Sequence, residues 1–153
     1  MGLYKGVVTQ SGADTTTQGI INTDLSVDGK SGWLITKLVV YWNNMKSGAV
    51  VDSELEAMLS TQVTTATVFS ASEELARVEF MGQLAGVAAS FAYMESIKEA
   101  VFVPSERITV QPQLYLTVAS AATGQANVVY YAIEYDIVKL TDNELLRLAV
   151  GGA

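Results

Sequence analysis

The sequence predicts an all-β domain, an antiparallel β-sandwich of about eight strands that ends in one short helix. Segments in which apolar and polar residues alternate recur along the chain and are rich in Val, Ile, Tyr and Thr, the residues typical of strands. Short clusters of Gly, Ser, Asp and Asn separate these segments and predict turns. The length of 153 residues fits a single domain over residues 1–153.

The first part of the chain predicts two strands. Residues 3–9 form a short strand within an N-terminal strand or arm over 1–12, and a polar loop over 11–17 follows it. Residues 19–27 form the second candidate strand. Asp28-Gly29 is a typical tight-turn pair and closes that strand.

The most apolar candidate strand covers residues 33–42, and both of its faces are apolar. In a regular strand, one face would carry Leu34, Leu38, Val40 and Trp42, and the other Trp33, Ile35, Val39 and Tyr41. A strand that is apolar on both faces is covered on both sides. Two interpretations stay open: a loop or terminus covers the second face, or a neighbouring subunit does.

The middle of the chain is less regular. Residues 55–69 alternate as a strand, with a break near 64–65 as an open alternative. Residues 72–74 either begin a helical turn or belong to a loop that leads into a strand over 76–81. The uncharged stretch 80–94 is either a buried connection followed by a strand, or a loop that contacts another subunit.

The C-terminal half predicts a hairpin. A short strand end at 101–104 precedes a segment in which Pro112 imposes a break, so that the next strand begins at Leu114. Small residues at 121–127 form the hairpin loop, and a long strand follows over 128–140.

The last element is a short helix over residues 141–150. Thr141 followed by Glu144 fits a capping box, in which each side chain bonds the other residue's backbone N–H. Gly151 can end this helix.

Composition excludes several classes of chemistry. The chain has no Cys and no His, so disulfides, thiol nucleophiles and histidine-based acid–base or zinc sites are absent. Two acidic pairs, Glu54 with Glu56 and Glu134 with Asp136, are two residues apart on predicted strands. Such acids are the ordinary solvated face of a strand. The sequence therefore predicts no enzyme and assigns no catalytic residue.

Cofactors and metals are not assigned either. Asp14, Asp24 and Asp28 lie in loop-rich sequence and could ligate Ca²⁺, but no acidic calcium-loop motif surrounds them. The net charge of −7, without any Lys/Arg cluster, argues against direct binding of nucleic acid. The longest uncharged stretch, 108–133, is too polar to span a membrane, and the N-terminus shows no signal peptide.

Low charge points instead to contacts with other subunits. Only 16% of residues are charged, and the mean hydropathy is positive at +0.29. Since large exposed apolar areas usually mark interaction sites, we expect partners, first of all copies of the same chain, to cover part of the surface. The contacts are expected in the N-terminal strand, on the second face of the strand 33–42 and in the stretch 80–94. The candidate contact residues are Leu3, Tyr4, Trp33, Trp42, Phe80, Leu84, Phe91 and Tyr93.

The order of elements in the C-terminal half resembles that of a known family. A strand end at 102–104, the strand from Leu114, the hairpin loop 121–127, the strand 128–140 and the final helix look like the closing strands of a small single jelly-roll viral capsid protein or capsid decoration protein. The resemblance is one of architecture.

This resemblance implies a jelly-roll-like sandwich. It also implies a structural protein of the virion that assembles with itself and with other shell proteins. Many genome-packaging capsids have a basic N-terminal arm, whereas residues 1–29 here contain Lys5 as their one base. That departure favours a role without direct genome contact. The alternative function is a carbohydrate-binding β-sandwich that uses Trp33, Tyr41 or Trp42 and bound calcium.

Overall fold

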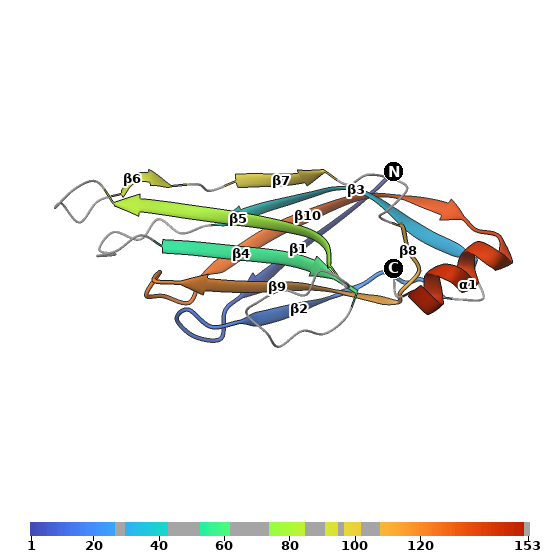
Figure 1. Cartoon of the computed structure of the whole chain (residues 1–153), viewed down its shortest axis with the longest axis horizontal. Helices are drawn as coiled ribbons and strands as arrows, with labels where there is room; N and C mark the ends of the chain where they lie inside the picture. The colour runs from blue at the N-terminus through green and yellow to red at the C-terminus, as the bar shows by residue number, and fades with distance from the viewer. Residues whose placement is uncertain are drawn as a thin grey trace.

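The structure is a computed structural model that describes residues 1–26, 30–42, 53–61, 74–84, 91–94, 97–101 and 108–151. Within these ranges it contains ten strands and one helix (Figure 1). The strands are β1 (Gly2–Thr9), β2 (Thr17–Asn22), β3 (Ser31–Trp42), β4 (Ser53–Ser60), β5 (Glu74–Leu84), β6 (Phe91–Met94), β7 (Ile97–Val101), β8 (Ile108–Thr109), β9 (Gln113–Ala121) and β10 (Val128–Lys139). The helix α1 (Asp142–Gly151) lies at one end of the molecule, beside β8 (Figure 1).

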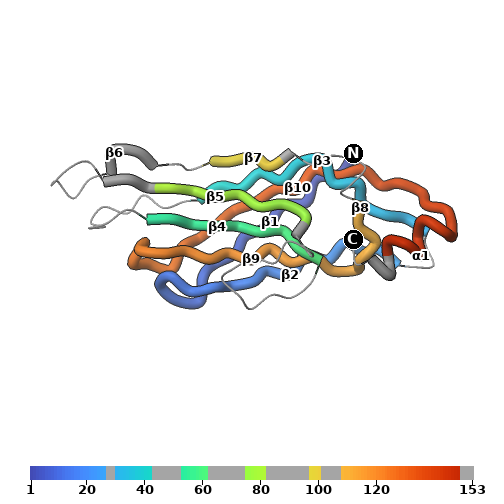
Figure 2. Tube along the Cα trace, viewed as in Figure 1, coloured from blue at the N-terminus to red at the C-terminus, as the bar shows by residue number. Residues whose placement is uncertain are grey.

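The strands form two antiparallel sheets. The first sheet has the order β1-β10-β3-β7, with β8 also paired to β3, and the second has the order β2-β9-β4-β5-β6. The chain pairs from its ends inward, β1 with β10, β2 with β9, β3 with β7 and β4 with β5. Figure 2 traces this path, a long hairpin rolled into two layers. It is the strand order of a jelly roll, and it confirms the predicted all-β sandwich.

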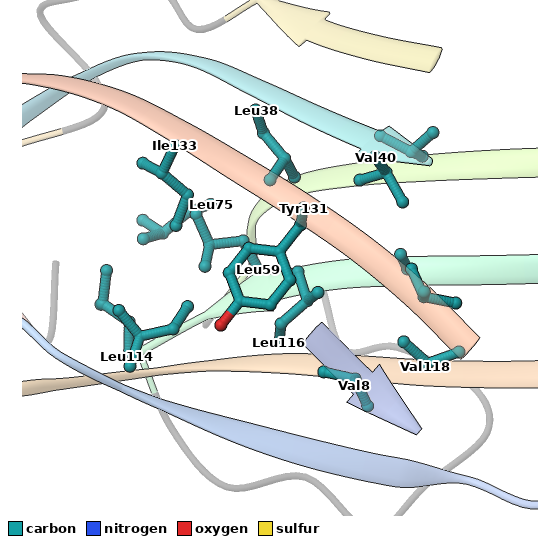
Figure 3. Packing of buried hydrophobic residues seen from close by; sticks show 14 of the residues in the cluster. Val8, Leu38, Val40, Leu59, Leu75, Leu114, Leu116, Val118, Tyr131 and Ile133 are labelled. Carbon is teal, nitrogen blue, oxygen red and sulfur yellow. The ribbon is translucent and has the colours of Figure 1, made fainter. Parts of the chain in front are cut away.

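The core lies between the two sheets and is built from alternate residues of each strand. Leu114, Leu116 and Val118 of β9 point inward from one sheet, and Tyr131 and Ile133 of β10 point inward from the other (Figure 3). Tyr131 is buried, and burial, followed by the neighbouring Tyr4, raises the pKa of its hydroxyl. The ring of Tyr131 therefore contributes to the core as a neutral group.

A bulge in β3 explains why this strand is apolar in both parities. Lys37 pairs with Glu134 and Ile35 pairs with Tyr135, so Thr36 is an extra residue without a partner on β10. An extra residue reverses the side-chain alternation beyond it. Trp33 and Ile35 before the bulge, and Leu38, Val40 and Trp42 after it, therefore all face the core. The assignment of residues 33–42 to two faces was wrong because it assumed a regular strand, whereas a subunit contact of the outward residues Val39 and Tyr41 stays a prediction.

Aromatic rings of β10 cover two glycines of β1. Gly2 lies opposite Tyr135 and Gly6 lies opposite Tyr131 in the ladder. A Cβ atom at either glycine would overlap the tyrosine ring. Tyr135 also stacks on Trp33, with ring centroids 3.8 Å apart and planes 10° apart. Because Gly2 and Gly6 have no side chains, the two tyrosine rings have room to lie against the backbone of β1.

Most predicted elements are confirmed, with changed ends. β2 ends at Asn22 instead of residue 27, because Asp24 has a φ of 57° and leaves the extended conformation. Residue 74 already belongs to β5, so a strand and not a helical turn begins there. The predicted break at Pro112 separates β8 from β9.

The predicted capping box is present at the start of α1. The Thr141 backbone N–H donates to Glu144 Oε2 at 2.8 Å, and the Glu144 backbone N–H donates to Thr141 Oγ1 at 3.3 Å. The bonds from Thr141 hold the pKa of the Glu144 carboxyl below its usual value.

No helix among the described residues is long and apolar enough to cross a membrane.

Some predictions fall outside the described residues. They are the turn at 28–29, the second half of the 55–69 strand, and the strand end over 102–104. Of the uncharged stretch 80–94, the two ends are the last residues of β5 and the strand β6, which pair with each other.

Candidate subunit-contact surface

The outer face of the first sheet carries a row of exposed apolar side chains. In the strand ladders, Val7 of β1 lies opposite Tyr130 of β10, Tyr130 opposite Tyr41 of β3, and Tyr41 opposite Ile97 of β7. Their exposed fractions are 52% for Val7, 46% for Tyr130, 37% for Tyr41 and 62% for Ile97. The row, called here the apolar row, therefore crosses four adjacent strands without a polar residue.

Two further rows run parallel to the apolar row and hold charges. The next row consists of Lys5, Ala132, Val39 and Glu99, and the one after it contains Leu3, Glu134 and Lys37. We call them the charged rows. Leu3 is 54% exposed, and Lys37 Nζ lies 3.8 Å from Glu99 Oε2. The charged rows hold two lysines and two glutamates, so their formal charges cancel.

Small side chains leave a shallow hollow in the middle of this face. The hollow has a volume of about 250 Å³, and its lining includes Lys5, Val39, Tyr41, Tyr130 and Ala132. The rings of Tyr41 and Tyr130 stand beside it, with centroids 6.1 Å apart and planes inclined by 34°. Since the lining is mainly apolar, water in this hollow would be readily displaced by a partner's side chain.

The outer face of the second sheet is more acidic than that of the first. Glu54 and Glu56 line a hollow of about 350 Å³ beside Ala119, Ser120 and Ala121. Glu56 lies directly opposite Glu79 of β5 in the ladder. Like charges in such cross-strand positions repel.

In the part of the chain that the structure describes, no three acidic, His or Cys side chains are placed to hold a metal ion.

The structure separates the predicted contact residues into four groups. Leu3 is exposed on the outer face, and its contact role stays a prediction. Trp33, Trp42 and Phe80 are at most 3% exposed and lie in the core, so they are not surface contacts. Tyr4 is partly buried against the core, with its ring 6.2 Å from that of Tyr131.

The remaining predicted contact residues belong to β5 and β6. Leu84 of β5 pairs with Phe91 of β6, and Gln83 pairs with Tyr93. Their side chains lie outside what the structure describes. A contact role for Leu84, Phe91 and Tyr93 stays a prediction.

Three of the acidic residues considered for calcium or catalysis lie beside hydrogen-bond donors or positive charges of the protein itself. Asp14 Oδ1 accepts hydrogen bonds from Thr123 Oγ1 at 2.5 Å and from Ser120 Oγ at 2.9 Å, and Asp14 Oδ2 accepts one from the Gly124 backbone at 2.9 Å. Glu134 is the ladder partner of Lys37, and Asp136 lies 3.4 Å from the N-terminal ammonium group. Asp28 is outside the described residues.

Sequence reasoning named none of the four residues in the apolar row as a contact, although it placed Tyr41 on the second face of residues 33–42. Tyr130 lies on the outward parity of the long C-terminal strand, but Val7 and Ile97 are isolated apolar residues in mixed sequence. No local pattern shows that they are aligned. The alignment appears only when the ladders bring β1 and β7 to the two edges of one sheet.

No protein-family model matches the chain, and no curated protein matches its sequence. Solved structures show looser similarities. A chain of Desmodium yellow mottle tymovirus has 9% identity and a TM-score of 0.39, with 92% of this chain and 89% of that chain covered. A latent aurone synthase (polyphenol oxidase) has 7% identity and a TM-score of 0.38, with coverages of 85% and 25%.

A third similar structure is that of infectious bursal disease virus, Gt strain, with 10% identity and a TM-score of 0.30. It covers 92% of this chain and 36% of the other. At TM-scores below 0.5 these are loose similarities of chain path. The case for function therefore rests on the surface of this chain.

Proposed function

We propose that this chain is a non-enzymatic structural subunit that assembles with copies of itself. The observation that carries the proposal is the apolar row, in which four large side chains on four adjacent strands are each between 37% and 62% exposed. Single exposed apolar residues are common on any protein, but an aligned group marks an interaction surface.

Composition supports the same proposal. Half of the residues are hydrophobic and only 16% are charged, whereas a typical soluble domain has about 25% charged residues. A surface that is covered in an assembly needs fewer charges for solubility than a free one. Closed symmetric assembly is the usual way in which a single chain covers such a surface.

The kind of assembly is proposed by analogy with the fold. Jelly rolls occur in viral capsid proteins and also in lectins and cupins, so the topology alone does not determine function. Together with an assembly surface, it favours a subunit of a virus capsid or of a layer on its surface. Other shell proteins would then be further partners, and the subunit would be located in the virion.

An acidic chain fits a shell role without direct contact to the genome. The net charge is −7, and the N-terminal strand carries Lys5 as its one base. Phosphate binding needs clustered Lys or Arg side chains.

The carbohydrate-binding alternative is weakened by the positions of two aromatic residues. Trp33 and Trp42 were predicted to stack on sugar rings in that alternative, but they are only 3% and 1% exposed. Trp42 Nε1 also donates to Asn127 Oδ1 at 3.0 Å inside the molecule. Of the three residues considered for this role, only Tyr41 is exposed.

Light scattering coupled to size-exclusion chromatography tests the proposal. We expect the molar mass of the purified chain to exceed the 16.3 kDa of one subunit and to rise with concentration, and negative-stain images to show rings, capsomers or shells. A single mass of one subunit up to millimolar concentration would contradict self-assembly. Retention on a glycan array by that monomer would favour the carbohydrate-binding alternative.

A further inference from the structure

We propose that two copies of this chain pack face to face through the apolar and charged rows, related by a two-fold axis parallel to the strands. The inference rests on the proposed self-assembly and specifies its first contact. The axis would pass between β10 and β3, the two central strands of the β1-β10-β3-β7 order.

This symmetry determines which residues meet. A two-fold axis along the strands reverses the strand order of the second copy and keeps each row at its own level. β1 then faces β7 of the second copy, and β10 faces β3. An isologous contact of this kind uses the same patch on both chains, so every pair of facing residues occurs twice.

The apolar row is complementary to itself under this operation. Val7 meets Ile97 of the second copy, and Tyr130 meets Tyr41. All four side chains are exposed in the single chain, and the contact would remove them from water. The hollow beside the two tyrosines gives room for the side chains that face it.

The charged rows are complementary to themselves as well. Lys5 at one edge of the sheet meets Glu99 of the second copy, whose own Lys5 meets Glu99 of the first. In the adjoining row, Glu134 meets Lys37. Four opposite-charge pairs therefore lie on one side of the central tyrosines. Under this symmetry no lysine faces a lysine, and no glutamate faces a glutamate.

Charge also favours this face over that of the other sheet as the place where two copies meet. Each chain has a net charge of −7, so two copies repel each other wherever acidic surfaces meet. The charged rows balance two lysines against two glutamates, whereas the outer face of the other sheet holds Glu54, Glu56 and Glu79 against one arginine, Arg77, which lies 3.9 Å from Glu79. Among the described parts of the two sheets, the neutral face is the one on which copies can meet at least electrostatic cost.

Charge reversal at Lys5 and Glu99 tests the pairing. Within one chain these residues are three strands apart, about 14 Å, so they do not form a pair with each other. Lys5→Glu places Glu opposite Glu twice in a homodimer, and Glu99→Lys places Lys opposite Lys twice. We expect each variant to weaken its own dimer about tenfold. Mixing the two variants restores both opposite-charge contacts, so the heterodimer should regain the wild-type affinity.

Native mass spectrometry of an equimolar mixture, with one variant isotopically labelled, gives the readout. The predicted result is a heterodimer well above the statistical half of all dimers. Glu54→Lys, on the other sheet, serves as the control, because it changes the net charge as Glu99→Lys does and should mix statistically with Lys5→Glu. Thermal unfolding of dilute samples checks that Glu99→Lys, which loses its neighbour Lys37, stays folded.

The possible outcomes separate this inference from the proposed function. If wild-type chains associate but the two variants mix statistically, the two-fold pairing is wrong and self-assembly stands. If the wild-type chain stays monomeric at every concentration, both are wrong. Wild-type affinity of each variant for itself would likewise overturn the pairing, and would leave this face to another partner.

Discussion

At the scale of single residues, Asp14 ties two distant loops together. It lies between β1 and β2 with a φ of 52°, a conformation that Asp tolerates better than most residues. Its carboxylate accepts hydrogen bonds from the loop between β9 and β10, including one from the Thr123 backbone at 3.0 Å. Burial raises the pKa of Asp14, but the bonds from Thr123, Gly124 and Ser120 outweigh it, and the pKa is lowered.

We predict that Asp14→Ala lowers the free energy of unfolding by about 1–3 kcal/mol, because buried donors lose their acceptor. The lowered pKa adds a dependence on pH. The stabilisation by Asp14 is complete above the pKa of the unfolded chain, about 4, and is lost as pH falls through the folded-state pKa. Urea unfolding from pH 6 to pH 2 measures this. The wild type and Asp14→Ala should converge at the acid end, and a constant difference would contradict the account.

A second polar residue, Asn127, also links distant parts of the chain, and it is buried. Asn127 is 1% exposed, and its Nδ2 donates to Gln10 Oε1 at 2.7 Å while its Oδ1 accepts from Trp42. The sequence showed Asn127 only as the last residue of a hairpin loop. Such partners, more than 80 positions away in the chain, could not be predicted because no local pattern records them.

At the scale of elements, local alternation predicted strands well wherever the backbone is regular. The inward parity of β10, with Val129, Tyr131 and Ile133 buried, follows directly from the sequence. The capping box of α1 was predicted for the same reason, since its partners are three residues apart. The bulge at Thr36 was not predicted, because it depends on how β3 pairs with β10.

The bulge leads to a prediction for β3. Deleting Thr36 removes the unpaired residue, so that Trp33 and Ile35 share one parity with the core residues after the bulge, and this variant should still fold. Thr36→Ala keeps the residue count and loses one hydrogen bond, from Thr36 Oγ1 to the Glu134 carbonyl at 3.2 Å. That variant should lose only about 0.5–1.5 kcal/mol. Soluble yield and circular dichroism measure the folding of both variants, and a deletion variant that does not fold would contradict the assigned bulge.

At the scale of the whole molecule, composition predicted a covered surface, and three of the residues named for it are buried in the core. The low charge indicated subunit contacts, and the largest aromatic residues were taken as the contacts. Trp33, Trp42 and Phe80 instead fill the core, since a sandwich of two sheets needs large side chains between its layers. The apolar row consists of two tyrosines, one valine and one isoleucine, and only the sheet order brings them together.

The central claim is that self-assembly uses the outer face of the β1-β10-β3-β7 sheet. Sedimentation velocity of Tyr130→Asp tests it most directly, because a charge in the middle of the apolar row opposes burial of that row. Ile20→Asp is the matched control, since Ile20 is 58% exposed on β2 of the other sheet. We expect Tyr130→Asp to sediment as a folded monomer at concentrations where the wild type and Ile20→Asp associate. Association of Tyr130→Asp equal to that of the wild type would contradict the account.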